Sequence, residues 1–341
     1  MKLSVLDQST ASKGRTQDAA IRETLALARH CDALGYHRFW VSEHHNSGNI
    51  VGTAPEVLMA AIAATTPRIR VGSAGVMLPH YSALKVAEQF RVLEAIAPGR
   101  IDLGLGRAPG SDPLTARALN PNAQNVHDQF PQQVQELQHW VTGTPLPEGH
   151  PFRRIDAQPT GPSAPAIWIL GSSDYGAQLA AYLGMPYAFA YFFSDGFGVE
   201  QALDLYRKSF RASAGNPKPI ATICVWVLAA DTEEEALFQF KSRERSSIDR
   251  EFGLRMPLIS PEEAAAHPYT PAEMAITEKL RRKAIVGSAE QVTAQLTELA
   301  QRLGLDELVI VTWTYDPASR HRSYELLAQA FELDKTAVGA V

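Results

Sequence analysis

Residues 70–105 read RVGSAGVMLPHYSALKVAEQFRVLEAIAPGRIDLGL, and this stretch holds one complete copy of the unit that decides the fold. Two short apolar runs, Arg70–Ser73 and Ile101–Leu105, have the composition of buried strands. Between them, Ala83–Ala97 predicts a helix that ends at the Pro98-Gly99 turn. A strand, a helix and a second strand in this order form the βαβ unit of a parallel sheet.

The same alternation continues in both directions along the chain. Eight strands, each followed by a helix and with no break in composition, are the count for a (β/α)₈ TIM barrel. A doubly wound open sheet alternates in the same way, and the count alone does not exclude it. We expect the barrel, with residues 1–341 as a single domain. The expected strands are Lys2–Leu6, Arg38–Ser42, Arg70–Ser73, Ile101–Leu105, Ala166–Leu170, Tyr187–Tyr191, Ile220–Leu228 and Leu308–Thr312.

An insertion is expected between strands seven and eight, at residues 246–286. It is too long for a simple strand-to-helix loop. Two helical segments flank its Pro-rich stretch, Met256–Pro271, and a capping box at Ser288–Gln291 opens the second of them. Such an insertion at the mouth of a barrel can form a lid, and a surface excursion without a role is the alternative.

The composition excludes several classes of protein. The chain has 341 residues, of which 45% are hydrophobic and 20% charged, so it is neither disordered nor fibrous. Thirty-two basic and 37 acidic residues give a net charge of −5, which favours neither nucleic acid nor anionic lipid. Cys31 and Cys224 form neither a disulfide framework nor a zinc cluster, and the longest apolar run, Ala221–Ala230, is half a membrane span. We therefore expect a cytoplasmic enzyme without nucleic-acid or membrane partners.

The ends of the expected strands carry the candidate binding residues, because a barrel binds its ligands at that face. Gly171-Ser172-Ser173 precedes a helix, whose first N–H groups and positive dipole end favour a phosphate. The alternative is that Ser173 or Asp174 only caps the helix. Arg107, at a neighbouring strand end, is the candidate charged partner of that phosphate, and a salt bridge at the rim is its alternative.

The run Gly104-Leu105-Gly106 is not a dinucleotide fingerprint. The sequence that follows, from Arg107 to Gly110, misses the G-x-G-x-x-G spacing by one residue, and no helix opens directly behind it. The chain therefore offers no evident nicotinamide site of its own.

Glu43-His44-His45 follows the second strand and is the candidate catalytic motif. Adjacent residues of an extended chain point in opposite directions, which disfavours a shared metal ion, and we expect no metal site. One histidine in the barrel mouth, oriented by Glu43, can serve as a general base or hydrogen-bond donor. A structural pair buried under the loop is the alternative.

Four stretches together resemble the bacterial luciferase-like flavin-dependent monooxygenases, in particular their short, single-gene branch. The resemblance covers nearly the whole chain in order. The stretches are Glu43–His45, Val71–Pro79, Pro98–Asp112 (PGRIDLGLGRAPGSD) and Leu170–Ser173.

The resemblance implies a (β/α)₈ barrel that pairs through its early helices as a homodimer. It implies FMN, supplied in reduced form by a separate flavin reductase, and a reaction with O₂ and a small organic substrate. In the family, the residues that match Ala74 and Gly75 are joined by a cis peptide beneath the flavin ring. Arg107, with Ser172 and Ser173 beside Gly171, matches the phosphate site.

The resemblance also implies that His44, with Glu43, handles protons in the oxygen chemistry. Gly106 stands where luciferase has a reactive cysteine, so light emission is not expected. Two alternatives keep the barrel: an oxidoreductase that transfers hydride with the deazaflavin F420, and a non-catalytic flavin-binding protein. Phe189, Tyr191 and Phe192 are expected either in the wall of the pocket or in packing between the barrel and its helices.

Overall fold

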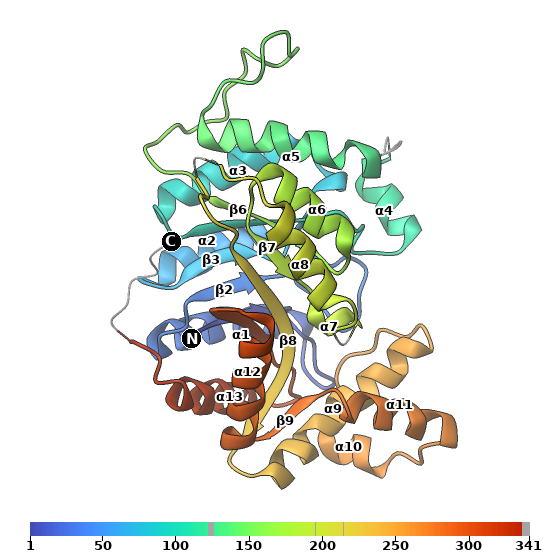
Figure 1. Cartoon of the computed structure of the whole chain (residues 1–341). Helices are drawn as coiled ribbons and strands as arrows, with labels where there is room; N and C mark the ends of the chain where they lie inside the picture. The colour runs from blue at the N-terminus through green and yellow to red at the C-terminus, as the bar shows by residue number, and fades with distance from the viewer. Residues whose placement is uncertain (122–125, 195, 214, 336–341) are drawn as a thin grey trace.

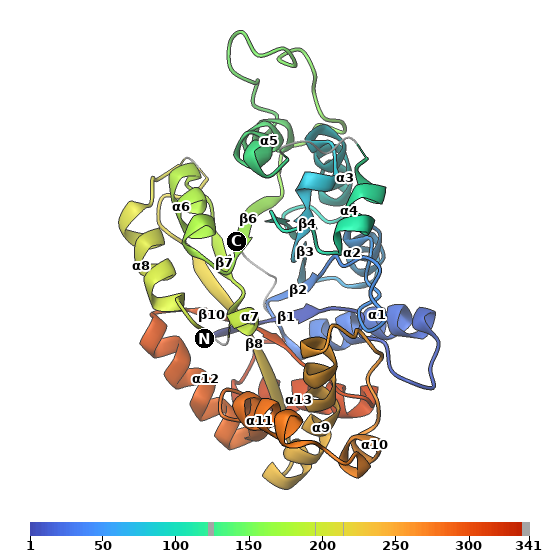
Figure 2. The ribbon, with the colours of Figure 1, turned by 90° about the vertical axis from the view of Figure 1, so that its right-hand side faces the viewer.

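Eight parallel strands close into a barrel in the computed structural model, which describes residues 1–121, 126–194, 196–213 and 215–335. The strands follow the order β10-β1-β2-β3-β5-β6-β7-β8, and β8 pairs with β10 to complete the ring, with helices outside it (Figures 1 and 2). The ring confirms the predicted (β/α)₈ barrel and excludes the open sheet. The strands are β1 (Lys2–Asp7), β2 (Arg38–Val41), β3 (Arg70–Ser73), β4 (Val76–Met77), β5 (Ile101–Gly106), β6 (Ala166–Gly171), β7 (Tyr187–Phe189), β8 (Ala221–Ala230), β9 (Ile285–Ser288) and β10 (Glu307–Val311).

The helix predicted at Ala83–Ala97 is confirmed as α3, which spans Ala83–Ile96. Two other helices end at glycines in the left-handed region: Gly35 ends α1 with φ 89° and Gly304 ends α12 with φ 60°. The capping box of Ser288 and Gln291 is confirmed at the start of α12. The helices are α1 (Gln17–Leu34), α2 (Pro55–Thr65), α3 (Ala83–Ile96), α4 (Pro113–Leu119), α5 (Val126–Thr142), α6 (Asp174–Leu183), α7 (Tyr191–Ser194), α8 (Val199–Ser209), α9 (Glu233–Glu251), α10 (Pro261–Ala266), α11 (Pro271–Arg281), α12 (Ala289–Leu303) and α13 (Pro317–Ala330).

One predicted strand is too long. The sixth was expected at Tyr187–Tyr191, but β7 ends at Phe189 and Tyr191 begins the short helix α7. The chain turns there, since the N–H of Phe193 donates to the carbonyl of Ala190. A run of aromatic and small apolar residues fits a buried strand and a buried turn of helix equally well, so periodicity could not locate the boundary.

The segment 246–286 contains more helix than predicted, because the sequence indicated only two helical segments flanking a Pro-rich stretch. It contains the end of α9, all of α10 and α11, and the start of β9, which form a lobe beside the barrel (Figure 1). β8 belongs both to the barrel and to the lobe: its residues Ile223–Trp226 pair with β10, and its residues Val227–Ala230 pair with β9. Residues 336–341 of the predicted domain lie outside the described residues.

The apolar core has two parts. The larger lies between the strands and the surrounding helices, and the smaller fills the barrel, where Trp40 packs edge-on against Trp168 with 5.2 Å between ring centroids. None of the helices in the described part of the chain has the length and apolar character needed to cross a bilayer.

A buried ion cluster lies near the amino-terminal ends of the strands. The carboxylate of Asp102 in β5 accepts hydrogen bonds from Arg38 Nη1 in β2 (2.8 Å), Arg70 Nη2 in β3 (2.6 Å) and Trp40 Nε1 (3.0 Å). Arg38 Nε also donates to Glu307 in β10 (2.8 Å). Burial alone would raise the pKa of Asp102, but the charges of Arg38 and Arg70 outweigh it and hold that pKa below its usual value.

Replacing Asp102 by Asn should lower the free energy of unfolding by about 3–5 kcal/mol, because Arg70 loses its buried counter-charge and Arg38 keeps only Glu307. The pKa of Asp102 is lower in the folded than in the unfolded chain. The difference between wild type and variant should therefore hold above about pH 5 and shrink as the pH falls below the usual aspartate value of 3.8. Denaturant unfolding at several pH values measures this. Asp306→Asn, at an exposed aspartate, is the matched control, and an equal loss in both variants would contradict the prediction.

Candidate active site

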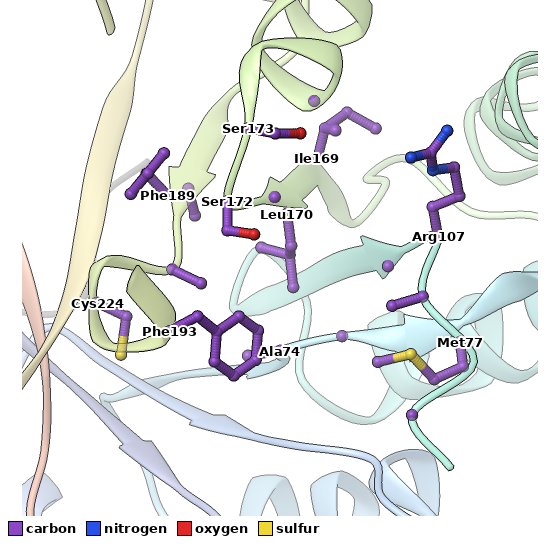
Figure 3. A pocket seen from close by; sticks show the side chains of 18 of the residues that line it. Ala74, Met77, Arg107, Ile169, Leu170, Ser172, Ser173, Phe189, Phe193 and Cys224 are labelled. Carbon is purple, nitrogen blue, oxygen red and sulfur yellow. The ribbon is translucent and has the colours of Figure 1, made fainter. Parts of the chain in front are cut away.

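A cavity opens at the carboxyl ends of the strands, and we call it the main cavity. It lies among the ends of β5, β6 and β7 and the loops that follow β2 and β3, which is the end at which barrels bind their ligands (Figure 3). Eight of the nine predicted site residues line it: His44, Ala74, Gly75, Gly106, Arg107, Gly171, Ser172 and Ser173.

One side of the main cavity is suited to an anion. Ser173 occupies the N-cap position of α6 but makes no side-chain capping hydrogen bond, and Asp174 instead accepts a hydrogen bond from Gln201 (2.6 Å). Arg107 lies across the cavity from Ser172 and Ser173 (Figure 3) and forms no ion pair with any described residue. Its guanidinium lies 3.9 Å from the ring centroid of Tyr175. The structure therefore shows neither a side-chain cap of α6 by Ser173 nor a salt bridge of Arg107 with a described residue, which were the two alternatives to a phosphate site.

The floor of the main cavity is narrow and apolar. The peptide bond between Ala74 and Gly75 is cis, as the resemblance implied. A Cβ on Gly75 would lie 2.5 Å from Leu170 Cδ1 and 2.8 Å from the carbonyl oxygen of Gly104. Glycine is needed there because no side chain fits between β3 and its neighbours.

His44 lies at the side of the main cavity. The pKa of its imidazole is lowered from 6.5 to about 4, chiefly by burial and in addition by the charge of Arg255, against the opposing charge of Glu43. Its Nδ1 is buried and has no hydrogen-bond partner among the described residues. At neutral pH the ring is therefore uncharged, with one nitrogen left for a ligand.

Glu43 does not line the main cavity, and its predicted contact with His44 is wrong. Its carboxylate accepts hydrogen bonds from Tyr81 Oη (2.6 Å), His45 Nε2 (2.8 Å) and the backbone N–H of Met77 (3.0 Å). His45 is therefore the histidine that Glu43 holds, while its neighbour turns toward the cavity. These hydrogen bonds connect the loop after β2 to the segment after β3, so Glu43 positions the two segments that border the cavity.

Several residues of the main cavity were not predicted from the sequence. Phe193 and Tyr175 add aromatic surface, Gln8 adds an amide, and Cys224 carries a thiol whose pKa burial raises well above its usual value. Of the three predicted aromatics, Phe189 and Phe192 line the cavity while Tyr191 packs on the core. Gln8 directly follows β1, so its place at a strand end was the signal available.

The geometry and the sequence place the chain in a family. The family described as "Luciferase-like monooxygenase" matches residues 1–307, and the chain belongs to it, so the protein is an oxidoreductase enzyme. A Bacillus subtilis protein known as uncharacterized protein YwcH is 44% identical over 332 residues, which are 97% of this chain and 99% of that protein. An N-acetyl-S-alkylcysteine monooxygenase of Bacillus subtilis is 38% identical over 331 residues, 97% and 98% of the two chains.

Solved structures agree with this assignment. The crystal structure of apo-MsnO8 has a TM-score of 0.89 and 37% identity, and covers 98% of this chain and 99% of its own. Two structures below 25% identity share the fold. One is the oxygenating constituent of 3,6-diketocamphane monooxygenase in complex with FMN (TM-score 0.71, 21% identity, 97% of each chain). The other is an F420-dependent secondary alcohol dehydrogenase (TM-score 0.67, 13% identity, 96% and 98%).

The imidazole of His44 should stay neutral from pH 8 down to about pH 5 and gain its proton near pH 4. Nitrogen-15 NMR of histidine-labelled protein measures this, because the ring shifts report protonation and tautomer. The His44→Gln variant identifies the signal by its loss. A midpoint at or above 6.5, the usual histidine value, would contradict the burial that the structure gives this ring.

Proposed function

We propose that the protein is a monooxygenase that uses reduced FMN and O₂ to oxidise a small organic substrate. One observation carries the proposal: Arg107 faces the amino end of α6, where Ser173 makes no cap, across an apolar floor at the strand ends. An anionic tail beside a flat apolar ring is the shape of FMN. The relatives named as monooxygenases, and the FMN complex of a protein with the same fold, support the choice of cofactor.

FMN would be held at three places. Arg107 and the hydroxyls of Ser172 and Ser173 would bind its phosphate, with the first N–H groups of α6 adding the positive end of the helix dipole. The narrow floor at Ala74 and Gly75 would lie beneath the ring system, and Gly106 leaves room beside it. Phe189 and Phe193 would cover the ring from the side of β7 and α7.

Reduced FMN, when bound, supplies two electrons to O₂, so that one oxygen atom enters the substrate and the other leaves as water. The chain's own residues keep bulk water away and manage a proton. The apolar wall does the first, because water in the site diverts the oxygen to hydrogen peroxide. Neutral His44, which lines the cavity, would do the second by accepting or donating a hydrogen bond through a ring nitrogen.

Glu43 is a positioning residue in this proposal. Its hydrogen bonds to Met77 and Tyr81 fix the segment after the cavity floor, and its bond to His45 fixes the loop that carries His44. A separate flavin reductase would supply the reduced cofactor, because the sequence contains no dinucleotide fingerprint. The cytoplasmic location and the lid role of residues 246–286 also remain predictions.

Anaerobic titration with reduced FMN, oxidised FMN and reduced F420, followed by mixing with O₂, tests the proposal. We expect reduced FMN to bind most tightly and the bound flavin to be reoxidised by O₂. Tighter binding of F420, without reaction with O₂, would favour hydride transfer instead. Tight binding of FMN with no turnover of any kind would favour a flavin-binding protein, which is the remaining alternative.

Replacing Arg107 by Ala should weaken FMN binding about 10- to 100-fold, the loss expected for a charge-assisted hydrogen bond to phosphate. Riboflavin, which lacks the phosphate, should bind wild type and variant equally. Fluorescence quenching of each flavin measures both affinities. Arg117→Ala, at an exposed arginine of α4, is the matched control. An equal loss for FMN and riboflavin would show that Arg107 does not contact the phosphate.

A homodimer through the early helices is the proposed assembly. The exposed apolar residues Val57 on α2 (65% exposed), Val92 (48%) and Ile96 (46%) on α3 support it, since the two helices are neighbours. Sedimentation velocity should find twice the 37.2-kDa chain mass. Ile96→Glu combined with Val92→Glu should shift the protein to monomer, and Leu237→Glu on α9 should not. A monomeric wild type would contradict the proposal.

A further inference from the structure

A second cavity adjoins the main cavity, and we call it the basic chamber. The two share Gln8, His44, Gly110, Phe192 and Phe193, so His44 lies in the wall common to both. The basic chamber extends from that wall toward α9 and the residues after it, away from Arg107 and the amino end of α6. A molecule held in this chamber would reach the edge of the main cavity beside His44.

The charge in the basic chamber has one sign. Arg243, Arg250 and Arg255 line it, and none of the described residues that line it is an aspartate or a glutamate. The histidine in its wall is uncharged at neutral pH. Three guanidinium groups around one hollow raise the local concentration of anions, although the chain as a whole has a net charge of −5.

Buried hydrogen-bond donors surround the same space. The indole Nε1 atoms of Trp226 and Trp313 are buried, and neither has a hydrogen-bond partner among the described residues. Arg243 is 4% exposed, and its guanidinium lies 4.3 Å from the ring centroid of Trp226 and 5.4 Å from that of Trp313. The two indole N–H groups are buried donors without acceptors, which cost free energy, so they favour a ligand with acceptor oxygens.

Apolar surface completes the chamber. Phe192 and Phe193 form the side toward the main cavity, and Ile50 and Leu254 add aliphatic surface. This side would hold the body of a ligand whose charged end lies among the arginines.

Contacts with the rest of the barrel fix the position of Arg255. A Cβ on Gly48 would collide with the carbonyl oxygen of Arg255, so the two backbones are in direct contact. Three residues later, the N–H of Leu258 donates to Ala11 (2.9 Å), and its carbonyl accepts from the N–H of Lys13 (2.7 Å). The chain that carries this arginine is therefore attached to the loop after β1.

We infer that the basic chamber is the substrate site and that the substrate is an organic carboxylate with an apolar body. The carboxylate is held by Arg243, Arg250 and Arg255, and the body lies against Phe192 and Phe193 so that the atom to be oxidised reaches the main cavity beside His44. This inference rests on the proposed function, since it assigns the substrate of the proposed flavin enzyme. Guanidinium suits the role because its paired N–H groups match the two oxygens of a carboxylate.

Isothermal titration calorimetry tests the inference. The probes are hexanoate, phenylacetate, 3-phenylpropionate and N-acetyl-S-methylcysteine, each with its neutral primary amide, measured with and without FMN. We expect at least one carboxylate to bind at least tenfold more tightly than its amide. The variants Arg250→Gln and Arg255→Gln should each weaken that binding about fivefold or more, and should leave FMN binding unchanged.

Arg282→Gln is the matched control, because it removes an exposed arginine that does not line the basic chamber. Since Arg243 is buried, Arg243→Lys is used there and its folding is checked by thermal unfolding. Equal binding of acid and amide, equal losses in Arg282→Gln, or no binding by any probe would overturn the inference. Carboxylate binding without FMN binding would support the inference on the ligand and contradict the flavin proposal, so the two failures are distinguishable.

Discussion

The closed barrel depends on one buried carboxylate. Asp102 is fully buried and forms ion pairs with both Arg38 and Arg70, so the cluster would hold an excess positive charge inside the barrel without it. Through Glu307, which accepts from Arg38 and from Ser4, the cluster joins β1, β2, β3, β5 and β10. Apolar contacts favour many packings of similar energy, whereas a hydrogen-bonded ion cluster accepts few. It therefore fixes the register of the strands that carry the site.

Trp40 transmits this constraint to the main cavity. Its indole donates to Asp102, and its ring both packs on Trp168 and contributes to the cavity wall. The position of Trp40 also requires glycine at residue 72, because a Cβ there would lie 2.5 Å from Trp40 Cδ1 and 2.7 Å from Asp102 Cβ. The floor of the site is thus part of the rigid core. The surrounding walls, built from α7 and α9, lie outside the barrel and are free to differ between enzymes that share the floor.

Local patterns predicted what local interactions determine. Strand and helix positions followed from periodicity and from stops such as the Pro98-Gly99 turn, and Arg107 and Ser172 were chosen because each adjoins a strand end. Two hydrogen-bond donors to Glu43, Tyr81 and Met77, were not predictable, since each lies more than thirty residues away in the sequence. In α9 the polar sequence indicates a solvent-exposed face. Instead, Glu244 and Asp249 are buried because α10 and α11 pack against α9, and Arg243 is buried beside Trp226 and Trp313.

The arrangement of charge explains how one mouth could hold two ligands. Arg107 stands on one side, the arginines of the basic chamber on the other, and neutral His44 between them. A protonated histidine there would repel neither anion but would offer an acidic proton to the oxygen chemistry, which favours loss of peroxide. Burial keeps the ring neutral, and it would also keep water from the space between the two proposed ligands. Desolvation of this one side chain would therefore protect the proposed reaction.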